Sequence, residues 1–344
     1  MALLGRTANG LFWMFRYIER AENMARLVDA GTRISMTNLA AETDEWESIL
    51  VASGVADIYR EKYGEIDEAK VIDFMIRDQD NPSSIRSSID TARMNGRMVR
   101  TALTREVWEA VNDSYMTIKA ALVSPVTSRS LPRILDLVKT RCAYIRGTFF
   151  GTMLRNEIFD FCRLGAYLER ADNTARILDV KYWLLLPEHS SVGSALDNFQ
   201  WVSILRSVSA HRSYAWEYDA NYNGPDIIDF LMLNKRMPRS LGHCYNMMRE
   251  AMSYLDQDVE TRNPCVQRIT QIHDRLSNVT VRQVLDNGLH EFLESFIIEN
   301  NNVAGEIAKH YRFYPDLLPA NQSETQSQTQ QQTTDAGSMQ TQSG

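Results

Sequence analysis

The sequence has few of the residues that several protein classes require. It holds 16 Gly and 9 Pro among 344 residues, too few turn formers for a fold of many short strands. Its four cysteines lie far apart and form no Cys-x-x-Cys pair, which argues against a disulfide frame or a zinc site. No apolar run approaches the roughly 18 residues that span a bilayer, and Arg6 and Asn9 interrupt the apolar N-terminus, which therefore does not resemble a signal peptide. We expect a cytoplasmic protein that does not enter the membrane.

Basic charge and catalytic motifs are also scarce. The 37 Lys and Arg residues are outnumbered by 44 Asp and Glu, giving a formal charge of −7, so nucleic acid is not an expected partner. There is no Gly-x-Ser-x-Gly, glycine-rich phosphate loop or His-Glu-x-x-His, the usual signatures of hydrolases, nucleotide-binding proteins and metalloproteases. The acidic pairs at Glu19 and Glu22 and at Glu169 and Asp172 lack the histidines of a di-iron site. We predict neither a metal nor a cofactor.

What the chain does contain is a long internal repeat. The segment YIERAENMARLVD at 17–29 returns as YLERADNTARILD at 167–179, with eight of thirteen positions identical at an offset of 150 residues. Further matches at offsets of 155 and 156 residues continue as far as Arg93 and Arg249. A repeat this long indicates one compact unit that has been duplicated, because solenoid repeats are only about 20 to 50 residues long.

Apolar residues recur at helical spacing, which predicts an all-α fold, a tandem-duplicated, pseudo-two-fold bundle of about twelve helices. The predicted helices span residues 8–34, 42–58, 66–78, 84–104, 106–122, 131–150, 156–186, 195–219, 226–235, 240–258, 264–284 and 287–311. We expect two halves, 1–125 and 131–319, that share one core. Residues 320–344 are rich in Gln, Ser and Thr and have no large apolar side chain to bury except one Met, so we expect a disordered tail.

The repeated helix carries the same polar side chains in both copies. On a helical wheel they form a stripe with flanking arginines, opposite an apolar face. These residues are Glu19, Arg20, Asn23, Arg26, Glu169, Arg170, Asn173 and Arg176. A freely solvated face would tolerate many polar exchanges, so the matched groups are expected to have definite partners. Three arrangements stay open: a buried ion-pair and amide network between the two helices, a polar cleft that binds a ligand or partner peptide, or an exposed stripe.

A second cluster of charge follows Pro82. Four arginines spaced 7, 4 and 3 residues apart share one helical face, and they are Arg86, Arg93, Arg97 and Arg100. Guanidinium groups suit carboxylates and phosphates, so this face predicts either an ion-pair lattice with acidic helices or an anion-binding surface. Only Arg93 has an arginine counterpart, Arg249, so the first half would dominate such an anion site.

Three segments together resemble the bacterial alpha-E domain family. They are YIERAEN at 17–23, NPSSIR at 81–86 and RLGAYLERAD at 163–172, and the resemblance covers residues 1–319. It implies an all-helical protein of unassigned biochemical role, commonly encoded beside circularly permuted ATP-grasp ligase-like proteins and transglutaminase-like peptidases. The family's signature positions correspond to Glu19 with Arg20 and to Glu169 with Arg170, while the glutamine-rich tail lies outside it.

Three functions are compatible with these observations. The leading hypothesis is a non-catalytic helical accessory protein that docks an ATP-grasp ligase-like protein, or presents its peptide substrate, through the polar stripe and the four-arginine face. An alternative is an enzyme of the same peptide or amide-bond forming system that uses Glu19 or Glu169 as general acid or base. A third is a purely structural scaffold in which the stripes only hold the helices together.

Overall fold

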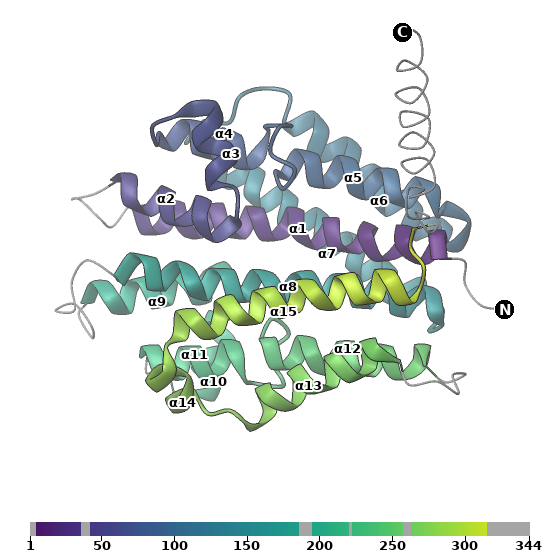
Figure 1. The fold of residues 1–344 in the computed structure, drawn as a ribbon. Helices are drawn as coiled ribbons and strands as arrows, with labels where there is room; N and C mark the ends of the chain where they lie inside the picture. Colours follow the sequence, from purple (N-terminus) through teal and green to yellow (C-terminus); the bar gives the residue numbers. More distant parts are fainter. Residues whose placement is uncertain (1–4, 36–41, 186–194, 220–221, 257–262, 315–344) are drawn as a thin grey trace, which may run out of the picture.

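The computed structural model describes residues 5–35, 42–185, 195–219, 222–256 and 263–314 (Figure 1). Within these ranges the chain forms fifteen α-helices and one short 3-10 helix, and it has no strand. The predicted all-α class is therefore confirmed. The predicted tail at 320–344 lies outside the described residues.

The helices follow one another with short connections. The first elements are α1 (Gly5–Ser35), α2 (Glu42–Ser53), α3 (Ala56–Tyr63), α4 (Glu68–Ile76), α5 (Ile85–Met98), the 3-10 helix η1 (Arg100–Ala102), α6 (Arg105–Ala121) and α7 (Leu131–Thr152). They are followed by α8 (Glu157–Leu185), α9 (Ala195–Ser207), α10 (His211–Glu217), α11 (Gly224–Met232), α12 (Leu241–Leu255), α13 (Pro264–Asn278), α14 (Val281–Asn287) and α15 (Leu289–His310).

The helix count differs from the predicted twelve because three predicted helices are each divided in two. The divisions between α2 and α3 and between α9 and α10 each contain a residue with positive φ, Gly54 at +72° and Ser209 at +57°. A left-handed backbone cannot continue a right-handed helix. The division between α13 and α14 occurs at Thr280, whose side chain accepts from the Gln283 backbone N–H and starts a new helix.

Two long helices, α1 and α8, form the centre of the molecule. In Figure 1 they lie side by side, with α3 to α5 on the far side of α1 and α10 to α13 on the far side of α8, while α2 packs against both central helices. They approach closely at Gly165, where a Cβ would lie 2.1 Å from the carbonyl oxygen of Phe12. One hydrophobic core contains side chains of both helices. The two copies of the repeated segment therefore face each other inside the molecule.

The order of helices in the second half parallels that of the first. Serine caps begin α5 and α12, where Ser84 accepts from the Ser87 N–H and Ser240 from the His243 N–H. The last long helices, α7 and α15, both have 22 residues. On this order α7 would pair with α15 and lie in the first half, whereas the predicted boundary at 125 assigns it to the second. The duplication itself stays an inference from the sequence.

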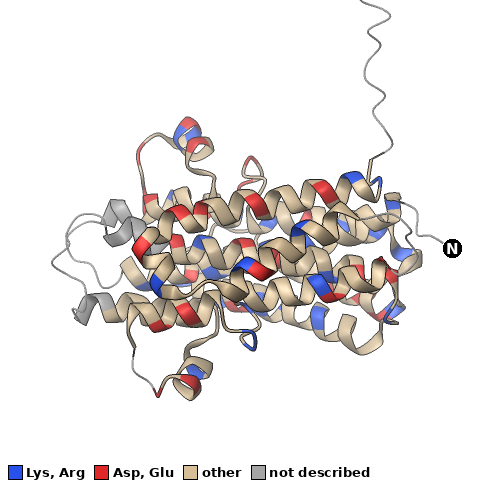
Figure 2. Cartoon of the chain, turned by 60° about the horizontal axis from the view of Figure 1, so that its bottom comes forward, with Lys and Arg blue, Asp and Glu red and all other residues tan. Residues whose placement is uncertain are grey.

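The helix surfaces carry charges of both signs. Acidic and basic residues are interspersed along the helices in Figure 2. Among the described helices, none combines the length and the apolar character that crossing a bilayer demands. All four cysteines are unpaired and buried.

Candidate functional site

Between α1 and α8 the two Glu-Arg motifs are paired with each other. Glu169 on α8 accepts hydrogen bonds from Arg20 Nε at 2.6 Å and from Arg16 Nε at 2.9 Å. In the opposite direction, Arg170 donates from Nη2 to Glu19 Oε1 at 2.5 Å. Glu19 has no exposed surface and Glu169 is 5% exposed. Each motif thus supplies the counter-ion of the other. Of the three arrangements left open by the sequence, the exposed stripe does not agree with this burial.

A second buried carboxylate, Glu22, extends this network. It binds Arg26 at 2.7 Å and Arg239 at 2.5 Å, and it is also paired with Arg146. Arg146, on α7, binds Glu19 as well, at 2.9 Å. The sequence analysis did not identify Arg146, which lies in no segment repeated between the two halves, or Arg239, which stands where the first half has Ser83.

The surrounding arginines keep these carboxylates ionised. Burial alone would raise the pKa of Glu19, but the charges of Arg146, Arg170 and Arg239 outweigh it and hold that pKa well below its usual range. Burial likewise opposes ionisation of Glu169, yet Arg20 and Arg16 lower its pKa to about 2. Such a buried network is stable only because its charges are nearly all paired.

Arg26 and Arg176 have matching contacts in the two halves. Each binds the acidic residue four positions before it, Glu22 at 2.7 Å and Asp172 at 2.7 Å. Each also donates to a carbonyl at the end of a neighbouring helix: Arg26 binds Ser207 O at 2.8 Å and Arg176 binds Ala52 O at 2.9 Å. These carbonyls lie in the last turns of α9 and α2, where no intrahelical partner is left for them. Both arginines therefore have a structural role.

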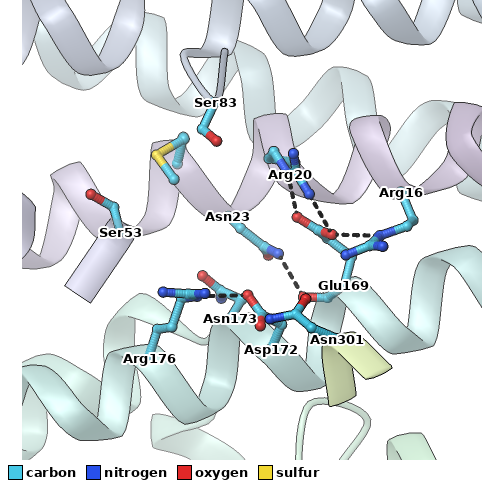
Figure 3. A pocket seen from close by; sticks show the side chains of 11 residues that line it. Arg16, Arg20, Asn23, Ser53, Ser83, Glu169, Asp172, Asn173, Arg176 and Asn301 are labelled. Atoms are coloured by element: carbon cyan, nitrogen blue, oxygen red, sulfur yellow. Dashed lines mark hydrogen bonds and ion pairs between the residues drawn. The ribbon is translucent and has the colours of Figure 1, made fainter. Parts of the chain in front are cut away.

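Beside the network lies a cavity of about 130 Å³ (Figure 3). The residues that line it are Arg16, Arg20, Asn23, Met24, Ser53, Ser83, Glu169, Asp172, Asn173, Arg176 and Asn301. Five of the eight predicted stripe residues are in this lining, so the structure brings them together. The other three, Glu19, Arg26 and Arg170, lie in the network and not in the cavity wall.

Two buried polar atoms in the cavity lining have no hydrogen-bond partner among the described residues: Asp172 Oδ1 and Asn173 Nδ2. Their residues are 9% and 6% exposed. The other carboxylate oxygen of Asp172 is bound by Arg176 (Figure 3). Leaving a buried donor or acceptor unpaired costs about 1 to 3 kcal/mol, so nearly all such groups in proteins are paired. The residues that line the cavity therefore include one unused acceptor and one unused donor.

Three of the four predicted surface arginines, Arg86, Arg93 and Arg97, lie on α5, whereas α5 ends at Met98 and Arg100 lies in the 3-10 helix η1. This group of arginines is separate from the cavity. Arg86 binds Asp90 on its own helix at 2.9 Å. Arg93 donates to Asn112 at 2.9 Å and lies over the ring of Tyr115. Arg97 and Arg100 are exposed, and none of the four arginines lines the cavity. The face is thus partly neutralised within the fold, and whether it binds an anion stays a prediction.

A larger cavity of about 400 Å³ lies between α8 and α12. Its lining is Phe150, Arg155, Phe159, Asp160, Arg163, Tyr167, Met247, Glu250 and Tyr254. Here the charged groups pair with one another, since Arg163 binds Asp160 at 3.2 Å and Glu250 at 3.2 Å. No side-chain atom in this lining is buried without a partner in the described part of the chain. Its polar groups therefore give less reason to expect a ligand.

Comparison with known proteins identifies the family. A family model named Alpha-E, described as a predicted alpha-helical domain with a conserved ER motif, matches residues 3–312. The match covers most of the chain, which belongs to this family. No curated protein and no solved structure matches the chain.

Proposed function

We propose that this member of the Alpha-E family is a non-catalytic helical protein that holds a small polar ligand between α1 and α8 and presents it to a partner enzyme. The observation that carries the proposal is the pair of buried, unpartnered atoms of Asp172 and Asn173 in the cavity lining. The ion pairs of Glu169 with Arg16 and Arg20 tie the α8 side of the cavity to α1, so the site is preorganised. Binding there would satisfy polar groups that the fold itself leaves unused.

The proposed partner is an ATP-grasp ligase-like protein of a peptide or amide-bond forming system, with a transglutaminase-like peptidase as a further component. The support for this is the family resemblance together with the size and polarity of the cavity. A substrate of such a ligase carries carboxylate, amine or amide groups, which match the donors and the acceptor in the lining.

The geometry disfavours the catalytic alternative. A general acid must hold a proton near neutral pH, and a general base is most effective when its pKa lies near the working pH. Neither condition is met by Glu19 or Glu169, because their arginine partners hold both pKa values far below neutrality. The purely structural alternative explains the ion pairs, but it gives no reason for the unused atoms of Asp172 and Asn173.

A reconstituted ligase assay tests the proposal. The chain and an ATP-grasp ligase-like protein from the same host are purified, and complex formation and ADP release are measured with the ligase alone and with the chain added. We expect a complex and faster ADP release. Asn173→Leu should abolish the acceleration, whereas Asn278→Leu, at an exposed position on α13, should retain it. The proposal is wrong if no complex forms and the rate is unchanged, or if the chain alone catalyses the reaction.

A further inference from the structure

The two halves differ at one position beside the cavity. The sequences Pro82-x-Ser84 and Pro238-x-Ser240 occupy matching positions before α5 and α12, and the variable residue is Ser83 in one and Arg239 in the other. The capping serines that follow make the same contact in both. Equivalent positions in the two segments thus carry a short side chain, Ser83, and a long one, Arg239.

Arg239 fills the space beside α1, the helix that carries the first copy of the repeated segment. It is 6% exposed, and its Nη2 binds Glu22 at 2.5 Å while its Nη1 lies 3.4 Å from Asn23 Oδ1. The Thr174 hydroxyl donates to the Arg239 carbonyl at 2.7 Å and fixes the segment. A guanidinium of the chain therefore satisfies an acidic side chain and the amide that follows it.

The equivalent place beside α8 is not filled by a long side chain. At the offset of 150 residues, Glu22 and Asn23 correspond to Asp172 and Asn173, the two residues with unpartnered atoms. Ser83 lines the same cavity but leaves these atoms without a partner. One of the two related sites is closed by the chain itself, and the other is left for a ligand.

The polar groups around the open site define the ligand. Asp172 Oδ1 needs an N–H donor, and Asn173 Nδ2 needs an acceptor. Arg16 uses only its Nε on Glu169, so its terminal amino groups form no hydrogen bond within the described residues. In formal charge the lining has three arginines against Glu169 and Asp172, which is a net +1. The ligand should therefore carry an anionic group and, close to it, an N–H.

Building on the proposed function, we infer that the cavity takes an α-amino carboxylate, either a free amino acid or the last residue of a peptide. Its N–H donates to Asp172 Oδ1, as Arg239 Nη2 does to Glu22. Its carboxylate accepts from Asn173 Nδ2 and the terminal amino groups of Arg16.

Titration calorimetry on the full chain tests this inference. L-Alanine and N-acetyl-L-alanine are the probes, and we expect at least one to bind, with acetate and methylamine at least tenfold weaker. Binding of L-alanine alone identifies a free amino acid, because acetylation removes its ammonium group. Binding of the acetylated compound identifies a peptide end. The inference is overturned if neither probe binds, or if acetate or methylamine binds as tightly.

The variant Ser83→Arg locates the site. The new arginine should fill the cavity beside α8, as Arg239 fills the equivalent space beside α1. We therefore expect the affinity for the probe to fall at least tenfold, while the urea concentration at the midpoint of unfolding does not fall. Ser253→Arg adds the same side chain at an exposed position on α12 and should bind like the unmodified chain. If Ser83→Arg does not fold, Asn173→Leu serves instead. A folded variant at either cavity position that binds normally refutes the assignment.

These results separate the ligand class from the partner. The titrations use the chain alone, whereas the proposed function is tested by the ligase rate. Tight binding of L-alanine without any effect on the ligase would leave the ligand class standing and refute the partner. Acceleration of the ligase by a chain that binds neither probe would support the partner and refute the ligand class.

Discussion

Replacing Glu19 by Gln is expected to lower the free energy of unfolding by about 3 to 5 kcal/mol, the usual cost of removing one partner from a buried ion pair. Glu19 is fully buried and is the counter-ion of Arg170 at 2.5 Å and of Arg146 at 2.9 Å. Glutamine has nearly the same shape but no charge, so little packing is lost. After the change Arg170 has no carboxylate partner, and Glu22 alone balances Arg146 and Arg239.

Urea unfolding followed by circular dichroism measures this effect, with the midpoint and the slope compared between variants. The matched control is Glu109→Gln, which breaks the exposed pair of Arg105 and Glu109, whose side chains are 84% and 56% exposed. Solvent screens that pair, so its loss should hardly move the midpoint. The double variant Glu19→Gln with Arg170→Gln should cost less than the sum of its single changes, because it removes both partners. Equal midpoints for Glu19→Gln and Glu109→Gln would refute the reasoning.

Three further outcomes are expected. The folded-state pKa of Glu169, about 2, lies below its ordinary 4.5, so the stability it contributes is complete above about pH 4.5 and is lost as the pH falls towards 2; urea midpoints that stay constant over this range would contradict the ion pairing. Gly165→Ala should destabilise the chain by about 1 to 3 kcal/mol or more, because the new Cβ would lie 2.1 Å from Phe12 O; an unchanged melting temperature would contradict that close approach. Burial raises the pKa of all four cysteine thiols, so a thiol reagent at pH 8 should react only after urea is added, and rapid labelling of the folded chain would be the contrary result.

Much of the fold could be predicted from hydrophobic spacing and turn residues. The long helices α1 and α8 follow from uninterrupted helical spacing of apolar residues, and the serine caps before α5 and α12 are local signals of a helix start. The divided helices were missed because their breaks are small. Ser209 adopts a positive φ, which serine seldom does, so the sequence does not predict it. Gly54 is a single glycine in an otherwise helical pattern. Such choices depend on how the neighbouring helices pack.

The site was predictable only where the two halves are alike. Comparison of the copies found Glu19, Arg20, Glu169 and Arg170, because both members of each cross-pair are repeated. Arg239 was missed because its counterpart is Ser83, and a search for similarity passes over the position that differs. A signal was nevertheless present: within two matching Pro-x-Ser segments, one half has an arginine and the other a side chain too short to replace it.

The reciprocal pairing of the two Glu-Arg motifs explains by itself why both are retained. Glu19 binds Arg170 and Glu169 binds Arg20, so a change in either motif would leave a buried charge unpaired in the other. This structural cost is enough to keep the Glu-Arg motif intact in both copies without any ligand. Preservation of the motif is therefore weak evidence for a function of its own. In the cavity lining, the atoms that no contact within the described residues satisfies are on Asp172 and Asn173, and experiments on function should begin there.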